Sequence, residues 1–325
     1  MRKFFIIINK KANHGTAAEN WKKVEQVLTS RKIDFVAKTT TNSGDAFSLA
    51  NRFAKSLKPS EKDDYVVMVV GGDGTLNDTI NGIKAADNGE IPLSFIPSGN
   101  NNNFATGIGL ASDPLIALEQ TLNATESSYY DVGEYTNANN HEQGYFLNDF
   151  GVGLDAYIIS LKNQMKKHPL LRRLHLGFIP YIFHVFEAYT NQEPFNVRVR
   201  VNQHYDFFKE AYLVNIANHP YYSGKIQLNP QADVNDHKLD LIVAEHMNFF
   251  NFLLLGILLY FRKQVKLPSV HYYKESSIHI SIDSLEFNQV DGEEKGNKYY
   301  DLYFNAKHYP FWVNVASVPL EKRNK

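Results

Sequence analysis

The sequence contains no cysteine among its 325 residues. This absence excludes disulfide bonds and thiolate zinc sites, and it fits a protein of the reducing cytoplasm. Long hydrophobic runs are also missing, because no segment reaches the roughly 18 apolar residues that a membrane-spanning helix needs. The first apolar run, Phe4–Ile8, is followed at once by the polar Asn9-Lys10-Lys11. It is too short for a signal peptide, so we expect a buried first strand there and a cytoplasmic protein.

An excess of charge of one sign is absent as well. The formal net charge is −1, so the overall charge does not draw the chain to nucleic acid. The sequence has no GxxxxGK[ST] phosphate loop and no His-Arg-Asp kinase motif. None of the twelve histidines has a ligand spacing such as HExxH, so we interpret them as surface or structural residues. Apolar residues make up 43% of the chain, enough for a large core in one or two domains.

The first third of the chain alternates short apolar runs with segments of helical spacing. Strands are predicted at residues 4–8, 33–37, 65–70 and 93–96, and helices at residues 17–29, 46–57 and 76–86. The run at 65–70 is apolar throughout, as in strands that are buried on both faces of a parallel sheet. This order predicts an α/β domain over residues 1–130, with an open Rossmann-like sheet.

The pattern changes near residue 130, where strand-like runs begin to follow one another directly. Several of them alternate with period two, which favours an antiparallel β-sandwich over residues 131–309. The runs are VRVRV (197–201), AYLVNIAN (211–218), KLDLIVAE (238–245), SSIHISI (276–282), LEFNQVDG (285–292) and YYDLYF (299–304). Two apolar segments with helical character, residues 170–189 and 249–261, interrupt these strands.

The segment VVMVVGGDGTLNDTINGI carries the clearest chemical signal. An apolar strand ends at Gly71-Gly72-Asp73-Gly74-Thr75, and a helix begins at once. Glycines let the backbone approach a bound group closely, and the free N–H groups at a helix start attract anions. The charge of Asp73 would repel a phosphate, so its role would run through Mg²⁺, through water or through hydrogen bonds from the loop or a ribose. Taken alone, the pentapeptide also suits an ordinary β-turn-α corner.

Four consecutive asparagines follow the fourth predicted strand in IPSGNNNNFATGIGL. Open α/β sheets bind ligands outside the carboxyl ends of their strands, and this run lies at the same edge as GGDGT. Asparagine tolerates left-handed backbone geometry, and its amide both donates and accepts hydrogen bonds. We therefore expect Asn100–Asn103 to line a ligand cleft without adding charge.

Seven segments of the chain, in the same order, resemble the motifs of the diacylglycerol kinase family, which also includes sphingosine and ceramide kinases. The resemblance covers essentially the whole chain. The segments are INKKANHG (8–15), TTNSGDA (40–46), GGDGTLNDTINGI (71–83), IPSGNNNNFA (96–105), NDFGVGLDA (148–156), ADVNDHKLDL (232–241) and VDGEE (290–294). Each motif alone is weak, whereas seven in order are specific. The resemblance implies an NAD kinase/diacylglycerol kinase-like first domain, to which residues 310–325 return.

The resemblance also implies the site and the reaction. ATP would lie in a cleft between the two domains, and its γ-phosphoryl group would pass in line to a lipid hydroxyl, in a role within phospholipid metabolism. Asp291 would be the general base, with Glu293 beside it. Without the resemblance, Asp291-Gly292 also suits a hairpin turn. The residues implied in nucleotide binding are Asn9, Thr40, Gly71, Gly72, Asp73, Gly74, Thr75, Asn77, Asn100 and Asn102.

A structural Mg²⁺ ion is implied at the segment ADVNDHKLD. Its ligands would be Asp233, Asp236 and the carbonyl of Lys238, since carboxylates and carbonyls suit a hard cation. His237 stands where the family has glycine, which alters the geometry of the turn. A solvated, aspartate-rich turn before a strand is the alternative interpretation.

The two apolar segments indicate where a lipid substrate could be reached. Rings and leucines beside basic residues are typical of helices at a membrane surface, so we expect peripheral membrane contact. The alternative is that both helices pack on the β domain. A homodimer is implied by the habit of the family. The basic residues are Lys166, Lys167, Arg172, Arg173, Arg262, Lys263 and Lys266.

Several positions depart from the family pattern, and three hypotheses stay open because of them. Asn100 replaces Thr or Ser, Asn103 replaces Asp, Thr106 replaces Arg, Thr16 replaces Lys and Asp78 replaces Glu. The first hypothesis is an active ATP-dependent lipid kinase, which we favour. The second is an NAD kinase-like enzyme with a soluble substrate, and the third is a catalytically weak binding protein for nucleotide or lipid. The lipid acceptor is open among diacylglycerol, phosphatidylglycerol, a sphingoid base and an undecaprenol-like alcohol.

Overall fold

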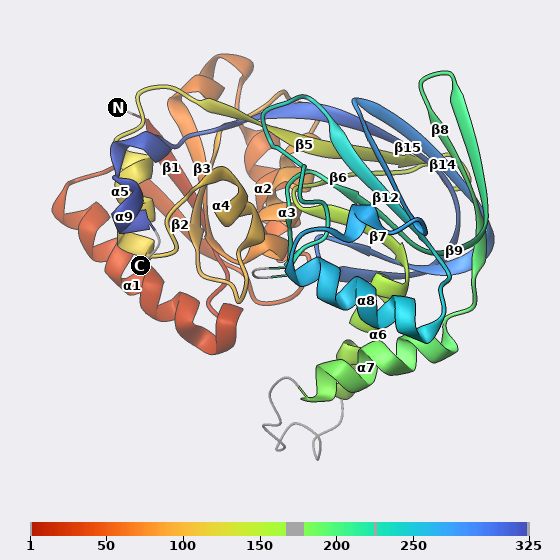
Figure 1. The fold of residues 1–325 in the computed structure, drawn as a ribbon. Coiled ribbons are helices and arrows are strands. Elements are labelled where there is room, and N and C mark those ends of the chain that lie inside the picture. The colour runs from red at the N-terminus through yellow and green to blue at the C-terminus, as the bar shows by residue number, and fades with distance from the viewer. Residues whose placement is uncertain (1, 167–178, 224–225, 324–325) are drawn as a thin grey trace.

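A computed structural model describes residues 2–166, 179–223 and 226–323 (Figure 1). Two lobes share one long sheet. Its thirteen described strands run in the order β13-β12-β9-β7-β14-β15-β4-β3-β1-β2, and β5, β6 and β8 pair beside this path. No described helix is long and apolar enough to cross a membrane.

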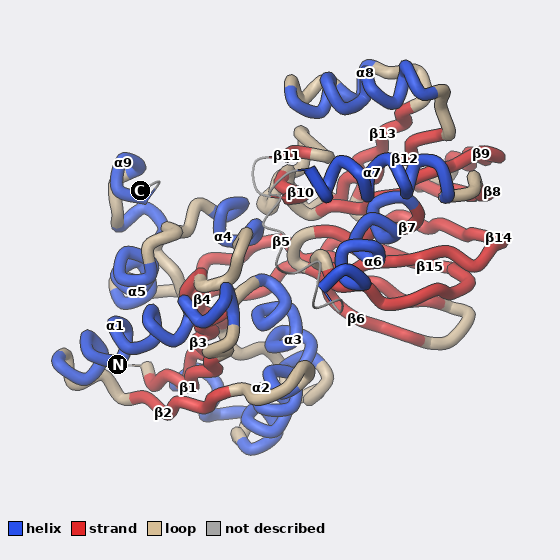
Figure 2. Tube along the Cα trace, turned by 90° about the horizontal axis from the view of Figure 1, so that it is seen from below, coloured by secondary structure: helices blue, strands red, loops and turns tan. Residues whose placement is uncertain are grey.

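The first lobe is an open sheet of parallel strands in the order β2-β1-β3-β4. Helices α1 and α5 cover one face and α2 and α3 the other (Figures 1 and 2). The central strand β3 is buried at almost every position, as its unbroken apolar sequence predicts. The elements are β1 (Lys3–Ile8), α1 (Thr16–Ser30), β2 (Phe35–Thr39), α2 (Asp45–Ser56), β3 (Tyr65–Gly71), α3 (Asp73–Lys84), β4 (Leu93–Pro97), α4 (Asn103–Ile108) and α5 (Pro114–Leu122).

The second lobe consists of antiparallel strands around a separate core, with α6, α7 and α8 against one side (Figure 2). In β8 buried and exposed residues alternate, as the period-two pattern predicts. The elements are β5 (Ser128–Asn137), β6 (Glu142–Phe146), β7 (Asp149–Gly153), α6 (Leu154–Lys166), α7 (Ile179–Asn191), β8 (Phe195–Val201), β9 (His204–Ala217), β10 (Tyr221–Ser223), β11 (Ile226–Gln227), β12 (Leu239–Glu245), α8 (Phe249–Tyr260), β13 (Val270–Glu275), β14 (Ser277–Val290) and β15 (Glu293–Phe311). The last helix, α9 (Leu320–Arg323), lies with the first lobe, near α5 (Figures 1 and 2).

The predicted fold class, α/β followed by an antiparallel β body, is confirmed. One detail differs, because the runs predicted at 276–282 and 285–292 form the single strand β14, whose register shifts between Ile282 and Glu286. The sequence predicts two separate strands there, whereas in the structure a β-bulge keeps the polar residues between the two runs within one strand. Of the predicted helical segment 170–189, residues 170–178 lie outside the described residues.

Strand β15 joins the two lobes. Its early part contributes Tyr300, Leu302 and Phe304 to the second core, while Tyr309 and Phe311 belong to the first. At its end Phe311 pairs in parallel with Leu93 of β4. The domain boundaries near residues 130 and 310 stay predictions, because strand β15 contributes residues to both cores.

Candidate active site

A backbone contact between two loops forms the centre of the site. β3 ends at Gly71, and α3 begins two residues later at Asp73. A Cβ atom added to Gly99, after β4, would lie 2.4 Å from the Cα of Gly72. No side chain fits at that distance, so glycine at position 99 lets the two loops touch. We call the segment Gly71–Thr75 the glycine corner. A Cβ on Gly74 would lie 2.5 Å from Oε1 of Glu293, so the turn after β14 lies over this corner.

A cleft of about 400 Å³ opens beside the glycine corner. It brings together five of the predicted residues, Asn9, Thr40, Gly74, Thr75 and Glu293. Two of these side chains are hydrogen-bonded, because the amide of Asn9 donates to Oγ1 of Thr75 at 3.2 Å. Lys11 and Asp78, which were not among the predicted site residues, also line it, and burial raises the pKa of Asp78 to about 6.

Asp291 lies in the turn between β14 and β15 with a left-handed backbone (φ 51°). Its carboxylate accepts hydrogen bonds from the backbone N–H groups of Leu147, Asn148 and Asp149, at 2.9, 2.7 and 3.1 Å. The side-chain amide of Asn77 donates to its Oδ2 at 2.8 Å. Asp291 is therefore held between the helix that follows the glycine corner and the start of the second lobe.

Burial raises the pKa values of the two carboxyl groups at the centre of the site, Asp73 and Asp291. Burial raises the pKa of Asp291 to about 6, although the N–H donors around it act in the opposite direction. Burial, together with the nearby charge of Asp291, raises the pKa of Asp73 to about 7. Oδ2 of Asp73 accepts from the N–H of Asn103 at 2.7 Å. Its buried Oδ1 has no hydrogen-bond partner among the described residues.

The asparagine run borders a second pocket of about 210 Å³, together with Asp73 and Asp291. Asn102 folds its amide onto the loop, since it accepts from the N–H of Gly99 and donates to the Gly99 carbonyl. Asn103 is buried and donates to the carbonyl of Tyr222 at 2.8 Å. Asn100 is exposed at the mouth of the pocket. Asn102 and Asn103 therefore shape the loop, and Asn100 faces the pocket.

Sequence reasoning missed a pair of buried carboxyl groups beside Asp291. Asp149 and Asp155 are both buried and share two amide donors, Gln289 and Asn215. Burial raises the pKa of Asp155 to about 6 and that of Asp149 well above its ordinary value. The signal was present in NDFGVGLDA, whose two aspartates lie on either side of a glycine-rich strand. Only Asp149 lines the second pocket.

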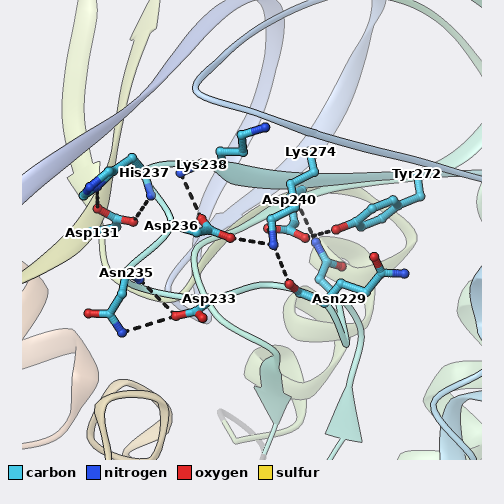
Figure 3. A network of polar contacts seen from close by, with 11 residues as sticks. Asp131, Asn229, Asp233, Asn235, Asp236, His237, Lys238, Asp240, Tyr272 and Lys274 are labelled. Carbon is cyan, nitrogen blue, oxygen red and sulfur yellow. Dashed lines mark hydrogen bonds and ion pairs between the residues drawn. The ribbon is translucent and has the colours of Figure 1, made fainter.

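The residues predicted to hold a structural Mg²⁺ lie apart from this site, in the loop before β12 (Figure 3). Asp233 accepts from the N–H of Asn235, and Asp236 accepts from the N–H of Lys238, both at 3.0 Å. The second oxygen of Asp236 is 2.6 Å from the ammonium of Lys274. The ammonium of Lys274 therefore lies beside Asp236, where the cation was expected. While the ammonium is there, the oxygens of this loop do not fit a metal ion.

One further group of described residues has metal-ligand character. The group consists of Asp131, His237 and His308, whose candidate ligand atoms all lie within 4.8 Å of one another. The two histidines are exposed, whereas Asp131 is buried. Both histidines lie at the surface, as predicted, but the sequence does not reveal the group, because its members are far apart in the chain.

An apolar cavity of about 150 Å³ lies between α6, α7, α8 and β12. Leu154, Tyr212, Ile242 and Phe252 are among its lining residues. Ile158 and Tyr222 line both this cavity and the pocket that contains Asp291. The apolar space therefore adjoins the polar site.

Comparisons with known proteins cover both lobes. The family described as "Diacylglycerol kinase catalytic domain" matches residues 3–135, and the "YegS C-terminal NAD kinase beta sandwich-like domain" matches residues 150–311. A Bacillus subtilis protein named "Putative lipid kinase YtlR" is 27% identical over 298 residues, which span 91% of this chain and 94% of that protein. The diacylglycerol kinase of Staphylococcus haemolyticus is 28% identical over 84% of this chain and 76% of its own length.

A solved structure supports the same fold. It is described as that of "a putative diacylglycerol kinase" from Bacillus anthracis, and it matches with a TM-score of 0.73 and 22% identity. The match covers 98% of this chain and 97% of the other.

Proposed function

Because this chain belongs to the diacylglycerol kinase family, a family of lipid kinases, we propose that it transfers the γ-phosphoryl group of ATP to a lipid hydroxyl. One observation carries the proposal. The hydrogen bond between Asn77 and Asp291 joins helix α3, which begins at the predicted phosphate-binding segment Gly71–Thr75 (the phosphate corner), to the turn that carries the predicted base. Phosphoryl transfer depends mainly on the positions of the reacting groups and on charge neutralisation, and this hydrogen bond bears on the first of the two.

ATP would bind with its phosphates at the glycine corner. The touching backbones of Gly72 and Gly99 and the N-terminus of α3 offer N–H groups at close range. Asn9, Thr40 and Thr75 add neutral polar groups to the adjoining cleft. Among the described residues lining that cleft, Lys11 is the one permanent cation. The site therefore depends on a metal ion to neutralise a triphosphate.

Mg²⁺ suits the donors that this site offers. The buried Oδ1 of Asp73 lacks a hydrogen-bond partner among the described residues, and a carboxylate oxygen is a preferred Mg²⁺ ligand. We assign Asp73 to the metal, which would draw charge from the phosphates when it is bound. Binding would also draw the proton off Asp73, whose raised pKa of about 7 leaves it partly protonated near neutral pH.

Asp291 would act on the acceptor hydroxyl. With a pKa of about 6 it is mostly ionised near pH 7, yet it is basic enough to accept a proton late in the transfer. Its four hydrogen-bond donors, Asn77 and the N–H groups of residues 147–149, fix its position. Glu293, over Gly74, lines the adjoining cleft, where the phosphates would lie.

The lipid would enter from the second lobe. The apolar cavity shares Ile158 and Tyr222 with the pocket of Asp291, so an acyl chain in the cavity could present its hydroxyl to the base. Helix α8 covers the cavity and exposes apolar side chains, with Phe250 and Tyr260 more than 80% exposed. Arg262 and Lys263 follow directly. These features support a cytoplasmic protein that docks on a membrane by α8.

A second candidate is a weak, nucleotide-binding member of the family. The scarcity of cations around the phosphate corner, with threonine at positions 16 and 106, favours it. A kinase for a soluble substrate such as NAD is less well supported, because it would have no use for the apolar cavity.

An assay of purified protein with γ-labelled ATP separates these candidates. Extracts are resolved after incubation with diacylglycerol, phosphatidylglycerol, a sphingoid base, an undecaprenol-like alcohol or NAD. Labelled lipid that requires Mg²⁺ is the expected result. Label on NAD alone would favour the soluble-substrate kinase. Nucleotide binding without any labelled product would favour the weak binding protein.

A further inference from the structure

The loop between β11 and β12 collects negative charge at one point. It supplies the carboxylates of Asp233 and Asp236, and Asp240 follows at the start of β12 (Figure 3). Asp240 is fully buried, and its Oδ2 accepts no hydrogen bond among the described residues. The carbonyl of Gln231 lies close by. Three carboxylates and a carbonyl form a donor set that requires a cation.

Lys274 supplies a cation to this donor set. It lies on β13 directly opposite Asp240. Its ammonium lies 2.6 Å from Oδ2 of Asp236, 3.9 Å from Oδ2 of Asp240, and donates to the Gln231 carbonyl at 2.6 Å. Burial alone would lower the pKa of Lys274, but the neighbouring aspartates raise it above its ordinary value. The lysine is therefore charged and in contact with this donor set (Figure 3).

A divalent ion and this ammonium exclude each other. Mg²⁺ needs oxygen ligands at about 2.0–2.1 Å in near-octahedral order. At Asp236 it would compete with the ammonium for Oδ2, because Oδ1 already accepts from the N–H of Lys238. Two cations at that separation would also repel each other strongly. We propose that the ammonium of Lys274 replaces the structural divalent cation of this loop, so that the loop holds its shape without Mg²⁺.

The test is thermal unfolding of the full chain, first freed of all metal and without nucleotide, in EDTA and in millimolar Mg²⁺. We expect the same Tm for the wild-type protein in both buffers. Lys274→Ala should lower the Tm in EDTA by several degrees and recover part of the loss in Mg²⁺, because the freed oxygens then bind the ion. Lys238→Ala, which removes a lysine charge from the loop itself, should not respond to Mg²⁺.

Two results would overturn the proposal. One is a wild-type Tm that falls when EDTA removes Mg²⁺, and the other is a Lys274→Ala protein whose Tm does not respond to Mg²⁺. Adding Asp236→Asn to Lys274→Ala should abolish the response, which assigns it to this loop and not to the nucleotide site. If Lys274→Ala does not fold, the comparison of wild-type protein in the two buffers still decides.

An independent observation concerns Asp131, His237 and His308. Asp131 and His308 pair across β5 and β15, and Nδ1 of His308 is 2.6 Å from Oδ1 of Asp131. Nδ1 of His237 approaches the same oxygen at 3.3 Å, while its backbone N–H holds Oδ2 at 2.7 Å. Two imidazole nitrogens thus converge on one buried carboxylate, with the rings open to solvent.

This donor set suits a different kind of metal. Two neutral imidazoles and a carboxylate prefer Zn²⁺ over Mg²⁺, and three protein ligands leave a position for water. The ligands come from three segments that are distant in sequence, and Val234, in the same loop as His237, packs into the first core. The geometry points to a Zn²⁺ site that ties this loop to strands β5 and β15.

Calorimetric titration of untagged, metal-free protein with Zn²⁺ tests this site. We expect one tight Zn²⁺ per wild-type chain and its loss in His308→Ala and in His237→Gly. Glycine suits the left-handed backbone at 237 (φ 63°), so that change removes the imidazole without strain. His204→Ala, on a distant hairpin, should bind as the wild type does. No binding by wild type, or unchanged binding by both site variants, would overturn the assignment.

Discussion

The side-chain amide of Asn77 donates a hydrogen bond to Oδ2 of Asp291 at 2.8 Å, although the two residues lie 214 positions apart. The same amide donates to the carbonyl of Tyr145 at 2.8 Å. Asn77 therefore binds, from helix α3, both the turn that carries the proposed base and strand β6. The distance between the phosphate corner and the base depends on this amide.

Asn77→Ala should lower the rate of lipid phosphorylation by about 100-fold, because a small displacement of a reacting group has effects of that size. The unpaired carboxylate and carbonyl should also destabilise the fold by about 1–3 kcal/mol. Asn88→Ala is the matched control, since Asn88 also donates to two backbone carbonyls but lies away from the cleft. An equal loss of rate in both variants would argue against a positioning role for Asn77.

Asp291→Asn should reduce the rate by about 10²–10⁴-fold, because an amide cannot accept the proton of the acceptor hydroxyl. The new NH₂ group would also face the N–H groups of residues 147–149. Asp301→Asn, in a partly exposed ion pair with His279, is the control. Lipid phosphorylation and circular dichroism are measured together. A folded Asp291→Asn protein with the full rate would remove Asp291 from the mechanism.

Activity and stability should respond to pH in opposite directions. Activity should rise as pH passes about 6, because Asp291 must lose its proton. Burial raises the pKa values of Asp73, Asp155 and Asp291 above those of the unfolded chain, so folding takes up protons between about pH 4 and 7. Their contribution to the unfolding free energy is therefore present at low pH and is lost as pH rises through the folded pKa values.

Denaturant unfolding from about pH 4.5 to 7.5 measures this slope. Asp73→Asn should reduce it, since one of the groups that take up a proton is then gone. A slope that is unchanged in Asp73→Asn would mean that Asp73 titrates as it does in the unfolded chain.

Gly99→Ala should weaken ATP binding at least tenfold, because its Cβ would lie 2.4 Å from the Cα of Gly72 and would force the two loops apart. Gly256→Ala provides the opposite control. No atom lies within 4 Å of a Cβ there, in the middle of α8, so alanine should stabilise that helix by about 1 kcal/mol. Titration with a non-hydrolysable ATP analogue gives the affinities. Normal affinity in Gly99→Ala would exclude a role for the loop contact in nucleotide binding.

Replacing Phe250 and Tyr260 together by serine should reduce binding to anionic liposomes in about 50 mM salt, where surface charges are weakly screened. Both rings are exposed on α8, so their removal should leave the fold unchanged. Tyr129→Ser with Tyr205→Ser removes two rings of similar exposure from other surfaces. Sedimentation with the vesicles compares the pairs, and equal binding by both would contradict docking through α8.

The order of strands and helices in the first lobe follows from local patterns. An unbroken apolar run such as Tyr65–Val70, followed by glycines and a helix, has few alternatives. Motif order also predicted that Asn9, Thr40 and Thr75 would lie together, because they follow neighbouring parallel strands. Strand β14 was divided in the prediction, because a bulge and a turn have similar sequences.

Contacts between distant side chains were beyond the reach of the sequence. Lys274 carries no motif, and only the pairing of β12 with β13 brings it to Asp236 and Asp240. Asp149 and Asp155 were visible as residues, but their burial depends on Gln289 and Asn215 from other strands. The roles proposed for Asp291, Glu293 and the nucleotide-binding residues stay predictions that the variants above address.

Strand β15 sets an order of events during biosynthesis. The first core contains Tyr309, Phe311, Trp312 and Val313, beside strands made from the first hundred residues. An emerging chain therefore carries the apolar edge of β4 uncovered until residues 309–313 have left the ribosome. Contacts of such large sequence separation slow folding and leave intermediates prone to aggregate. A chain shortened by its last 15–20 residues should accordingly be recovered from cells mostly as insoluble protein, even though every residue of the phosphate corner is retained.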